Sequence, residues 1–224
     1  METTPLKLSS RAETVILSDY LKCISGLFVH IRDEKASARE FKRYADRIMH
    51  LVVEEGLAYI SDQSPVTITT PTKCVITGSS NNCNNIVGVS IIRAGDSMLD
   101  VFMKLIPEAS IGKILIQRDE ATCQPVLFYS KLPPLADKVV IILDPMLATG
   151  GSAMTAIQVL IDRGAVESNI YFFNVVSCPE GIANINSKYP GVKIVTATVD
   201  AGLNDQKYII PGLGDYGDRY YGTQ

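Results

Sequence analysis

The clearest structural signal in this chain is the stretch Val139-Val-Ile-Ile-Leu-Asp-Pro-Met-Leu-Ala-Thr-Gly-Gly-Ser152. Its first five residues are aliphatic and predict a buried strand, and apolar residues recur at helical spacing from Ala153 to Ile161. The turn between them points backbone N–H groups and hydroxyls at one place, in front of the positive end of a helix dipole. We expect it to bind a phosphate monoester, with Asp144 accepting hydrogen bonds from sugar hydroxyls. An ordinary glycine-containing turn is the alternative.

Two common nucleotide-binding loops do not fit this turn. A G-x-x-x-x-G-K-[ST] loop needs a lysine after its second glycine, and the turn has none. It therefore offers no side-chain cation to a β- or γ-phosphate. The turn also does not follow the G-x-G-x-x-G pattern of dinucleotide-binding folds.

The composition is that of a globular protein that forms one domain over residues 1–224. Of its 224 residues, 46% are hydrophobic and 20% are charged. The net charge of −3 argues against a general nucleic-acid binder, which usually carries a basic excess. No apolar run approaches the roughly 18 residues of a membrane span, and the N-terminus lacks the basic start and apolar core of a signal peptide. We expect a cytoplasmic protein without membrane association.

The cysteines and histidines give little material for a metal site or a disulfide framework. The five cysteines are scattered and form no C-x-x-C pair, and only His30 and His50 stand beside them. These features favour a reduced compartment. Catalysis by a Cys–His pair stays open.

Strand and helix patterns alternate over much of the chain. Strands separated by helices of about 10–15 residues predict an α/β fold, with a mainly parallel sheet and helices on both faces. Ligands of such folds bind beyond the carboxyl ends of the strands, so the Arg93 turn, Arg118 and the Asp144 loop should converge on one cleft. We expect strands at 86–92, 113–117, 139–143, 170–176 and 193–198, and helices at 96–106 (capped by Asp96), 153–164 and 179–188.

Further elements are expected between and before these. Residues 36–55 have the spacing of an amphipathic helix that Gly56 ends. Residues 66–70 alternate like a strand, and residues 77–85 have the polar composition of a loop. Residues 126–129 are expected to pair with the preceding strand in a small hairpin.

The C-terminal segment has a different character. The stretch Tyr208-Ile-Ile-Pro-Gly-Leu-Gly-Asp-Tyr-Gly-Asp-Arg-Tyr-Tyr-Gly222 is dense in glycine and tyrosine. Glycines let backbone groups approach a flat ligand closely, which favours a binding role. A rigid tail that its tyrosines pack onto the surface explains the composition equally well.

Four separated segments resemble the uracil phosphoribosyltransferases in their order along the chain, and most of all the eukaryotic members. They are VSIIRAG at 89–95, IGKILIQRDE at 111–120, DPMLATGGS at 144–152 and the stretch at 208–222. The resemblance implies a phosphoribosyltransferase-type, mainly parallel sheet flanked by helices, with a small β-hairpin and a C-terminal hood. Residues 1–35 would then be an N-terminal extension, and residues 199–224 the base-binding hood segment.

The same resemblance implies a reaction. Uracil and 5-phospho-α-D-ribose 1-diphosphate (PRPP) would give UMP and diphosphate in pyrimidine salvage, with Mg²⁺ accompanying PRPP. Arg118 and Asp215 are the candidate catalytic residues, Asp215 also serving the metal through PRPP or water, and the general base stays open. The implied PRPP-binding residues are Arg93, Arg118, Asp144, Pro145, Met146, Leu147, Ala148, Thr149, Gly150, Gly151, Ser152 and Asp215, and the implied uracil-binding residues are Ile209, Gly214, Asp215 and Tyr216.

The resemblance also bears on regulation and assembly. Some relatives are activated by GTP and associate as dimers or tetramers, so we expect a homodimer or homotetramer. Arg32, Arg39 and Arg43 form a basic group that could contact the phosphates of GTP as an allosteric effector. A solvated helix face, on which acidic residues such as Glu40 balance these charges, explains the group equally well.

Two alternative functions stay open. A phosphoribosyltransferase for another base, such as orotate or a purine, would share the phosphate loop, although orotate calls for a cation that residues 208–214 lack. A non-catalytic regulator of the same fold that binds UMP and RNA would carry a basic face. The acidic composition argues against such a face.

Overall fold

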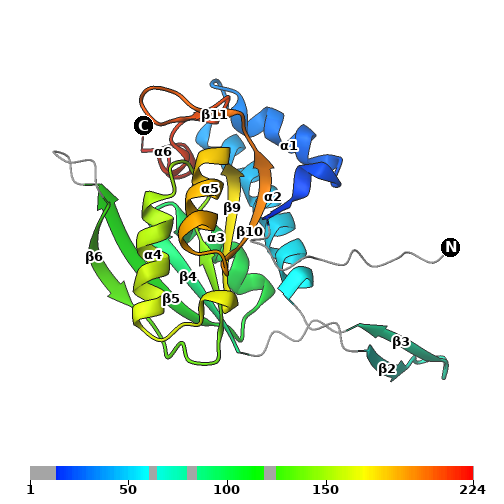
Figure 1. Cartoon of the computed structure of the whole chain (residues 1–224). Coiled ribbons are helices and arrows are strands. Elements are labelled where there is room, and N and C mark those ends of the chain that lie inside the picture. The colour runs from blue at the N-terminus through cyan, green and yellow to red at the C-terminus, as the bar shows by residue number, and fades with distance from the viewer. Residues whose placement is uncertain (1–13, 61–64, 80–84, 119–124, 224) are drawn as a thin grey trace.

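The computed structural model describes residues 14–60, 65–79, 85–118 and 125–223, without the side chains of Ser79 and Arg118. A central sheet lies between helices on both faces, and a two-stranded hairpin projects from the body (Figure 1). The α/β fold with a mainly parallel sheet, expected from the sequence, is confirmed.

The central sheet has eight strands, in the order β1-β10-β9-β7-β4-β5-β6, with β8 paired to β9 beside this path. Neighbouring strands are parallel except β6, which runs antiparallel to β5. The inner strands β4, β7 and β9 are mainly apolar and buried along almost their whole length, because helices cover both of their faces. The strands are β1 (Thr14–Ile16), β4 (Ile86–Ile92), β5 (Ser110–Arg118), β6 (Pro125–Lys131), β7 (Val139–Leu143), β8 (Met146–Leu147), β9 (Ile170–Ser177) and β10 (Lys193–Val199).

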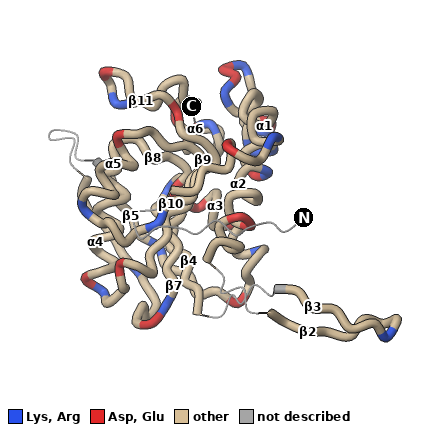
Figure 2. Tube along the Cα trace, turned by 45° about the vertical axis from the view of Figure 1, so that its right-hand side comes forward, with Lys and Arg blue, Asp and Glu red and all other residues tan. Residues whose placement is uncertain are grey.

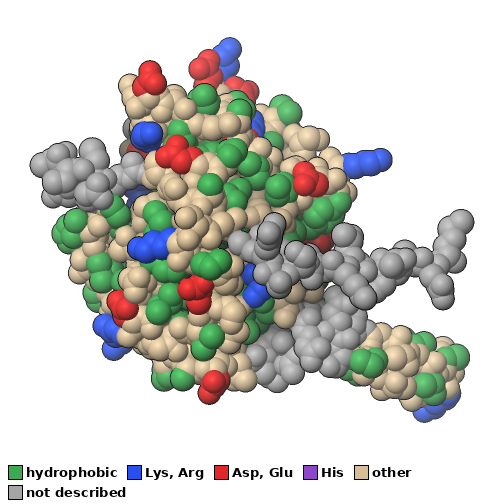
Figure 3. Space-filling model, in the orientation of Figure 1, with side chains coloured by type: hydrophobic (Ala, Val, Ile, Leu, Met, Phe, Trp, Pro, Cys, Tyr) green, Lys and Arg blue, Asp and Glu red, His purple; other side chains and the backbone are tan. Residues whose placement is uncertain are grey.

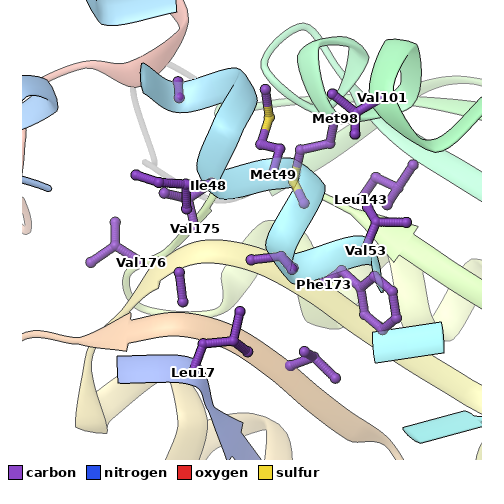
Figure 4. Packing of buried hydrophobic residues seen from close by; sticks show 14 of the residues in the cluster. Leu17, Ile48, Met49, Val53, Met98, Val101, Leu143, Phe173, Val175 and Val176 are labelled. Carbon is purple, nitrogen blue, oxygen red and sulfur yellow. The ribbon is translucent and has the colours of Figure 1, made fainter. Parts of the chain in front are cut away.

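Helices cover both faces of the sheet and divide the core in two. One core lies under α1, α2 and α3, and the other under α4 and α5. Figure 4 shows the first core, where Met49 and Val53 of α2 lie near Met98 of α3 and Phe173 of β9. The helices are α1 (Cys23–Arg32), α2 (Ala38–Ile60), α3 (Gly95–Leu105), α4 (Gly151–Asp162) and α5 (Pro179–Lys188).

Most expected elements are confirmed with small shifts at their ends. The bounds of β4, β7 and α5 are those expected from the sequence, and β5 and β6 form the expected antiparallel pair. β4 and β7 could be bounded so closely because their mainly apolar runs end at clear turn residues.

Gly56 does not end α2, so this expectation is wrong. The helix continues to Ile60. A Cβ built on Gly56 would lie 2.2 Å from Cζ of Phe173. Glycine is needed because the ring of Phe173 packs directly on the helix backbone, and the residue marks a close approach of α2 to β9.

Asp96 does not cap α3, which is a second correction. The N-cap residue is Ala94, and no side chain caps this helix. Asp96 instead accepts hydrogen bonds from Ser90 Oγ at 2.7 Å and from Lys113 Nζ at 2.9 Å. Its carboxylate therefore ties α3 to β4 and β5.

The expected polar loop at residues 77–85 is wrong in its first part. β2 (Pro65–Thr69) and β3 (Val75–Ser79) form an antiparallel hairpin that projects from the body (Figure 1). Cross-strand contacts such as the 2.9 Å hydrogen bond between the hydroxyls of Thr67 and Thr77 support a strand despite its polarity. Residues 80–84 lie outside the described residues.

The described parts of both terminal segments, which begin at Thr14 and end at Thr223, pack on the body. β1 pairs in parallel with β10, and α1 packs on α2 through Ile24 and Ile31, which are at most 1% exposed. The described residues that we grouped with an N-terminal extension thus contribute to the core. The C-terminal hood contains β11 (Gly202–Leu203), β12 (Ile209–Ile210) and α6 (Tyr216–Tyr221).

Charges of both signs are spread over the surface. Figure 2 shows basic and acidic segments interspersed along the trace, and Figure 3 shows no continuous basic area over the described part of the face it presents. Mixed charge of this kind is a poor match for an RNA backbone. Of the helices in the described part of the chain, none has the length and apolar character needed to cross a membrane.

Candidate active site

The strand order creates a cleft at the carboxyl edge of the sheet. β4 lies between β5 and β7, so the connections that follow β4 and β7 leave the sheet in opposite directions. Ligands of open α/β sheets bind at such a reversal. A cleft of about 470 Å³ opens here, lined by Ala94, Asp144, residues 146–153, residues 206–209 and residues 214–217.

The cleft brings together most of the residues expected at the site. The loop after β7 and the hood are far apart in sequence, yet they line the same cavity. Pro145 lies buried behind this lining, and its carbonyl accepts hydrogen bonds from the N–H groups of Val175 and Val176, both at 3.0 Å. It fixes the loop to β9 without facing the cleft.

The loop at residues 144–152, called the phosphate loop below, is fixed on the side away from the cleft. A Cβ built on Gly181 of α5 would lie 2.4 Å from the carbonyl oxygen of Ala148, so α5 can approach the loop only with glycine there. Cys178 Sγ donates to the Ala148 carbonyl at 3.0 Å, and Asn184 Nδ2 donates to the Thr149 carbonyl at 3.0 Å. The carbonyls of the loop are therefore engaged on the side away from the cleft.

The N–H groups of the loop are free to bind an anion. Gly150, with φ of +84°, is the N-cap of α4, a conformation that favours glycine. Within the described part of the chain, no backbone N–H of residues 148–152 donates to a protein group. These donors meet the positive end of α4, an arrangement whose chemistry suits an anion.

Asp144 stands at the end of β7, and the pKa of its carboxyl is raised. It is partly buried, and this burial raises the pKa of its carboxyl from 3.8 to about 7, although a hydrogen bond from the backbone of Met146 opposes the shift. A carboxylate in a desolvated place binds hydroxyl donors strongly once they replace water. The position suits the vicinal hydroxyls of a ribose.

Arg93 lies at the rim of the cleft. It follows a cis peptide bond after Ile92, and its Nη2 donates to Asp218 Oδ1 at 2.6 Å while its Nη1 donates to Thr223 at 3.1 Å. The guanidinium is exposed, and only its neighbour Ala94 lines the cleft. The hydrogen bond to Asp218 raises the pKa of Arg93, which stays a cation available to an incoming anion.

Arg118 ends β5 next to the phosphate loop. Its side chain lies outside the described residues, as do Asp119 and Glu120. Its backbone pairs with Pro125, and a Cβ built on Gly151 would lie 3.6 Å from Cγ of Pro125. The strand end is thus close to the start of α4.

The hood forms the opposite wall. Gly214, with φ of +79°, and Asp215 are exposed towards the cleft, whereas Ile209 is buried. Asp215 Oδ1 accepts the N–H of Asp218 at 2.9 Å, which caps α6. One carboxylate oxygen of Asp215 therefore has a structural role.

Tyr216 contributes backbone to the cleft and its side chain to the core. The residue is 2% exposed, and its hydroxyl donates to Met49 Sδ at 3.3 Å. Its ring meets that of Phe41 edge-on, with 5.2 Å between centroids. Substitution here would disturb the core first, a consequence that sequence reasoning missed.

Sequence reasoning also missed the residues that hold the hood in place. Arg219 is buried and donates to the carbonyls of Ile31 and Leu213, both at 2.6 Å. Asp200 is 6% exposed and accepts from Arg32. No local pattern reveals these contacts, since Arg219 and Asp200 find Ile31 and Arg32 far away along the chain.

The basic group expected to serve an effector is divided in the structure. Arg32 is bound to Asp200 at 2.5 Å and faces the hood. Arg39 and Arg43 are exposed on α2, and the guanidinium of Arg43 lies 5.8 Å from the ring of Tyr44. Arg32 is therefore engaged within the protein, and Arg39 and Arg43 remain open to solvent.

The oxygen donors of the cleft suit a weakly held magnesium ion. Among the described residues, no group of three or more His, Cys, Asp or Glu side chains could hold a metal. Asp144 and Asp215 supply single carboxylates to the cleft. This arrangement fits Mg²⁺, which keeps water and substrate oxygens as most of its ligands.

Known proteins resemble the chain over most of its length. A family model described as uracil phosphoribosyltransferase matches residues 20–223. Proteins named uracil phosphoribosyltransferase are similar in Dictyostelium discoideum (48% identity, covering 96% of this chain and 99% of the relative) and in Lachancea kluyveri (50%, covering 88% and 90%). A solved structure, that of the AQ2163 protein from Aquifex aeolicus, superposes with a TM-score of 0.81 at 34% identity, covering 94% of this chain and 99% of that one. With four motifs in order and a family match over nearly all of its residues, the chain belongs to the uracil phosphoribosyltransferase family.

Proposed function

We propose that this protein is a pentosyltransferase that joins N1 of uracil to C1′ of PRPP, giving UMP and diphosphate. The observation that carries the proposal is the single cleft in which an anion-binding loop faces a backbone-rich hood. A nucleotide product has a phosphate at one end and a base at the other. The two walls match these two ends.

The loop binds and orients the sugar phosphate. The N–H groups of residues 148–152 hold the 5′-phosphate, and Asp144 accepts from the ribose hydroxyls. Positive charge develops at C1′ as its bond to diphosphate breaks. Catalysis is therefore mostly positioning, together with stabilisation of the departing anion.

Arginines on two sides of the cleft serve that departing anion. Arg93 leaves its contact with Asp218 to bind diphosphate, and Arg118 approaches from the end of β5. Mg²⁺, when bound with PRPP, neutralises part of the diphosphate charge. Asp215, whose Oδ1 caps α6, would help to hold this ion through PRPP or water.

The hood reads uracil with backbone groups. Uracil offers N3–H as a donor and O2 and O4 as acceptors, a pattern that the backbone of Ile209, Gly214 and Tyr216 can match. Cytosine presents an acceptor at N3 and a donor at C4. Each mismatch leaves a buried polar group unpaired, at a cost of about 1–3 kcal/mol. No described residue is assigned as the general base.

A base-exchange assay tests the proposal. Purified protein, PRPP and Mg²⁺ are incubated in turn with uracil, cytosine, orotate and hypoxanthine, and nucleoside monophosphates are measured by mass spectrometry. We expect UMP from uracil alone. Turnover of hypoxanthine or orotate without turnover of uracil would show a phosphoribosyltransferase for another base, and RNA binding without any turnover would show the regulator.

We also propose that the protein works in the cytoplasm as a homodimer or homotetramer and that GTP activates it. The exposed Arg39 and Arg43 support an effector site, since guanidinium groups suit triphosphates. Uracil turnover with and without GTP tests the activation, and light scattering tests the oligomeric state. Unchanged rates would rule out activation, and the mass of a single chain would rule out the oligomer.

A further inference from the structure

A partly buried ion pair connects the hood to the end of α1. Arg32 Nη1 donates to Asp200 Oδ2 at 2.8 Å, and Arg32 Nη2 donates to Asp200 Oδ1 at 2.5 Å. Asp200 is 6% exposed. Figure 1 shows the hood (orange to red) beside α1 (blue). Such a bidentate contact fixes distance and orientation together.

Both partners of this pair also hold one glycine of the hood. The N–H of Gly212 donates to Asp200 Oδ2 at 2.8 Å, and its carbonyl accepts from Arg32 Nη1 at 2.5 Å. Gly212 has φ of +61°, and a Cβ there would lie 2.0 Å from the carbonyl oxygen of Ile209. Gly212, which must be glycine, thus has both its backbone donor and its backbone acceptor fixed by the Arg32–Asp200 pair.

The held glycine lies between the residues that read the base. Ile209 and Gly214 line the cleft on either side of it, and Arg219 holds the carbonyl of Leu213 at 2.6 Å. Arg32 and Asp200 themselves are not part of the described lining. They can act on a ligand only through the backbone that they orient.

We propose that Arg32 and Asp200 are positioning residues that set the register of the uracil-reading backbone, an inference that rests on the proposed function. Backbone groups that bind a base cannot adjust by side-chain rotation. Their hydrogen-bond angles therefore depend on the contacts that fix the turn around Gly212. The phosphate loop is held separately, by α5 and Cys178. Loss of the Arg32–Asp200 pair should therefore affect uracil and spare PRPP.

The test compares Arg32→Lys and Asp200→Asn with wild type at low temperature, after circular dichroism has confirmed that each is folded. Lysine cannot make the bidentate contact, and asparagine removes the charge. We expect KM for uracil to rise about tenfold or more, since a charge-assisted contact is lost, while KM for PRPP stays within about twofold. Discrimination between uracil and cytosine should fall. Arg163→Gln, an exposed arginine at the end of α4, is the matched control and should change neither KM.

Several results would overturn the proposal. KM for uracil could stay unchanged, KM for both substrates could rise together, or kcat alone could fall. A variant that remains unfolded at low temperature also counts against it, because the pair would then serve global stability. Failure of the proposed function looks different, since wild type itself would then form no UMP.

Discussion

Asp144 combines two properties at the scale of the single residue. It stands where a ribose would lie, and burial raises the pKa of its carboxyl from 3.8 to about 7. Because the folded pKa exceeds the unfolded one, the folded protein binds the extra proton between these values, and stability falls as pH rises from about 4 to 7. In the proposed function, Asp144 would therefore serve ribose binding at the expense of stability above about pH 4.

Asp144→Asn should separate these two effects. We expect the variant to be more stable than wild type at pH 8, by about 2–4 kcal/mol, and about equal to it near pH 4. KM for PRPP should rise about tenfold or more because the ribose hydroxyls lose a charged acceptor. Urea unfolding at the two pH values and initial rates measure both. A variant that binds PRPP normally would refute the assigned role.

Tyr216 is a core residue whose backbone happens to line the cleft. Tyr216→Phe keeps the ring packed against Phe41 and should cost less than about 1 kcal/mol. Tyr216→Ala removes a side chain that is 2% exposed and should cost about 3–5 kcal/mol. Urea denaturation compares the two. Equal stability of the variants would show that the ring does not support the core.

The role of a residue could be predicted from the sequence where neighbouring residues determine its position. Asp144 and the glycines after it could be predicted, because strand, turn and helix follow one another within a single segment. The direction of the Tyr216 side chain could not, since α6 spans only residues Tyr216–Tyr221 and shows no usable period. The Arg32–Asp200 contact joins residues 168 positions apart, which no local pattern reveals.

At the scale of the element, packing between helices and strands overrides intrinsic helix propensity. α2 runs through Gly56 because a ring of β9 lies where a side chain would be. α1 was missed because Cys23–Arg32 contains a glycine and β-branched residues, which lower intrinsic helix propensity. Packing on α2 stabilises it instead.

Two glycines in helices give a matched test of this account. Gly56→Ala should destabilise the protein by about 1–3 kcal/mol, because its Cβ would overlap Phe173. Gly26→Ala on α1 is the control, since nothing lies within 4 Å of its Cβ, and it should stabilise by about 0.5–1 kcal/mol. Thermal unfolding measures both. A loss of stability in Gly26→Ala, or none in Gly56→Ala, would contradict the packing described.

At the scale of the whole molecule, the position of the cleft follows from the strand order, because the connections after β4 and β7 leave the sheet in opposite directions. The parallel sheet could be predicted from the alternation of strands and helices, and so could convergence of the loops at one edge. The strand order could not be predicted. The edge strand β1 could not be predicted either, because Thr14–Ile16 is only three residues long. Pairing with β10 alone defines it.

Removal of Mg²⁺ should stop turnover and leave the fold intact. The described residues form no protein cage for a metal, so Mg²⁺ should be held mainly by PRPP. Chelation with EDTA should abolish UMP formation and shift Tm by no more than about 2 °C. Restored magnesium should recover the rate. A large fall in Tm on chelation would reveal a structural metal.

The structure of the protein with UMP bound is the most direct test of the central claim, that one cleft holds the phosphate and the base on opposite walls. The phosphate should lie within hydrogen-bond distance of the N–H groups of residues 148–152, and the base should face the backbone of Gly214 and Tyr216. A nucleotide bound elsewhere, or in this cleft with its two ends reversed, would contradict the account.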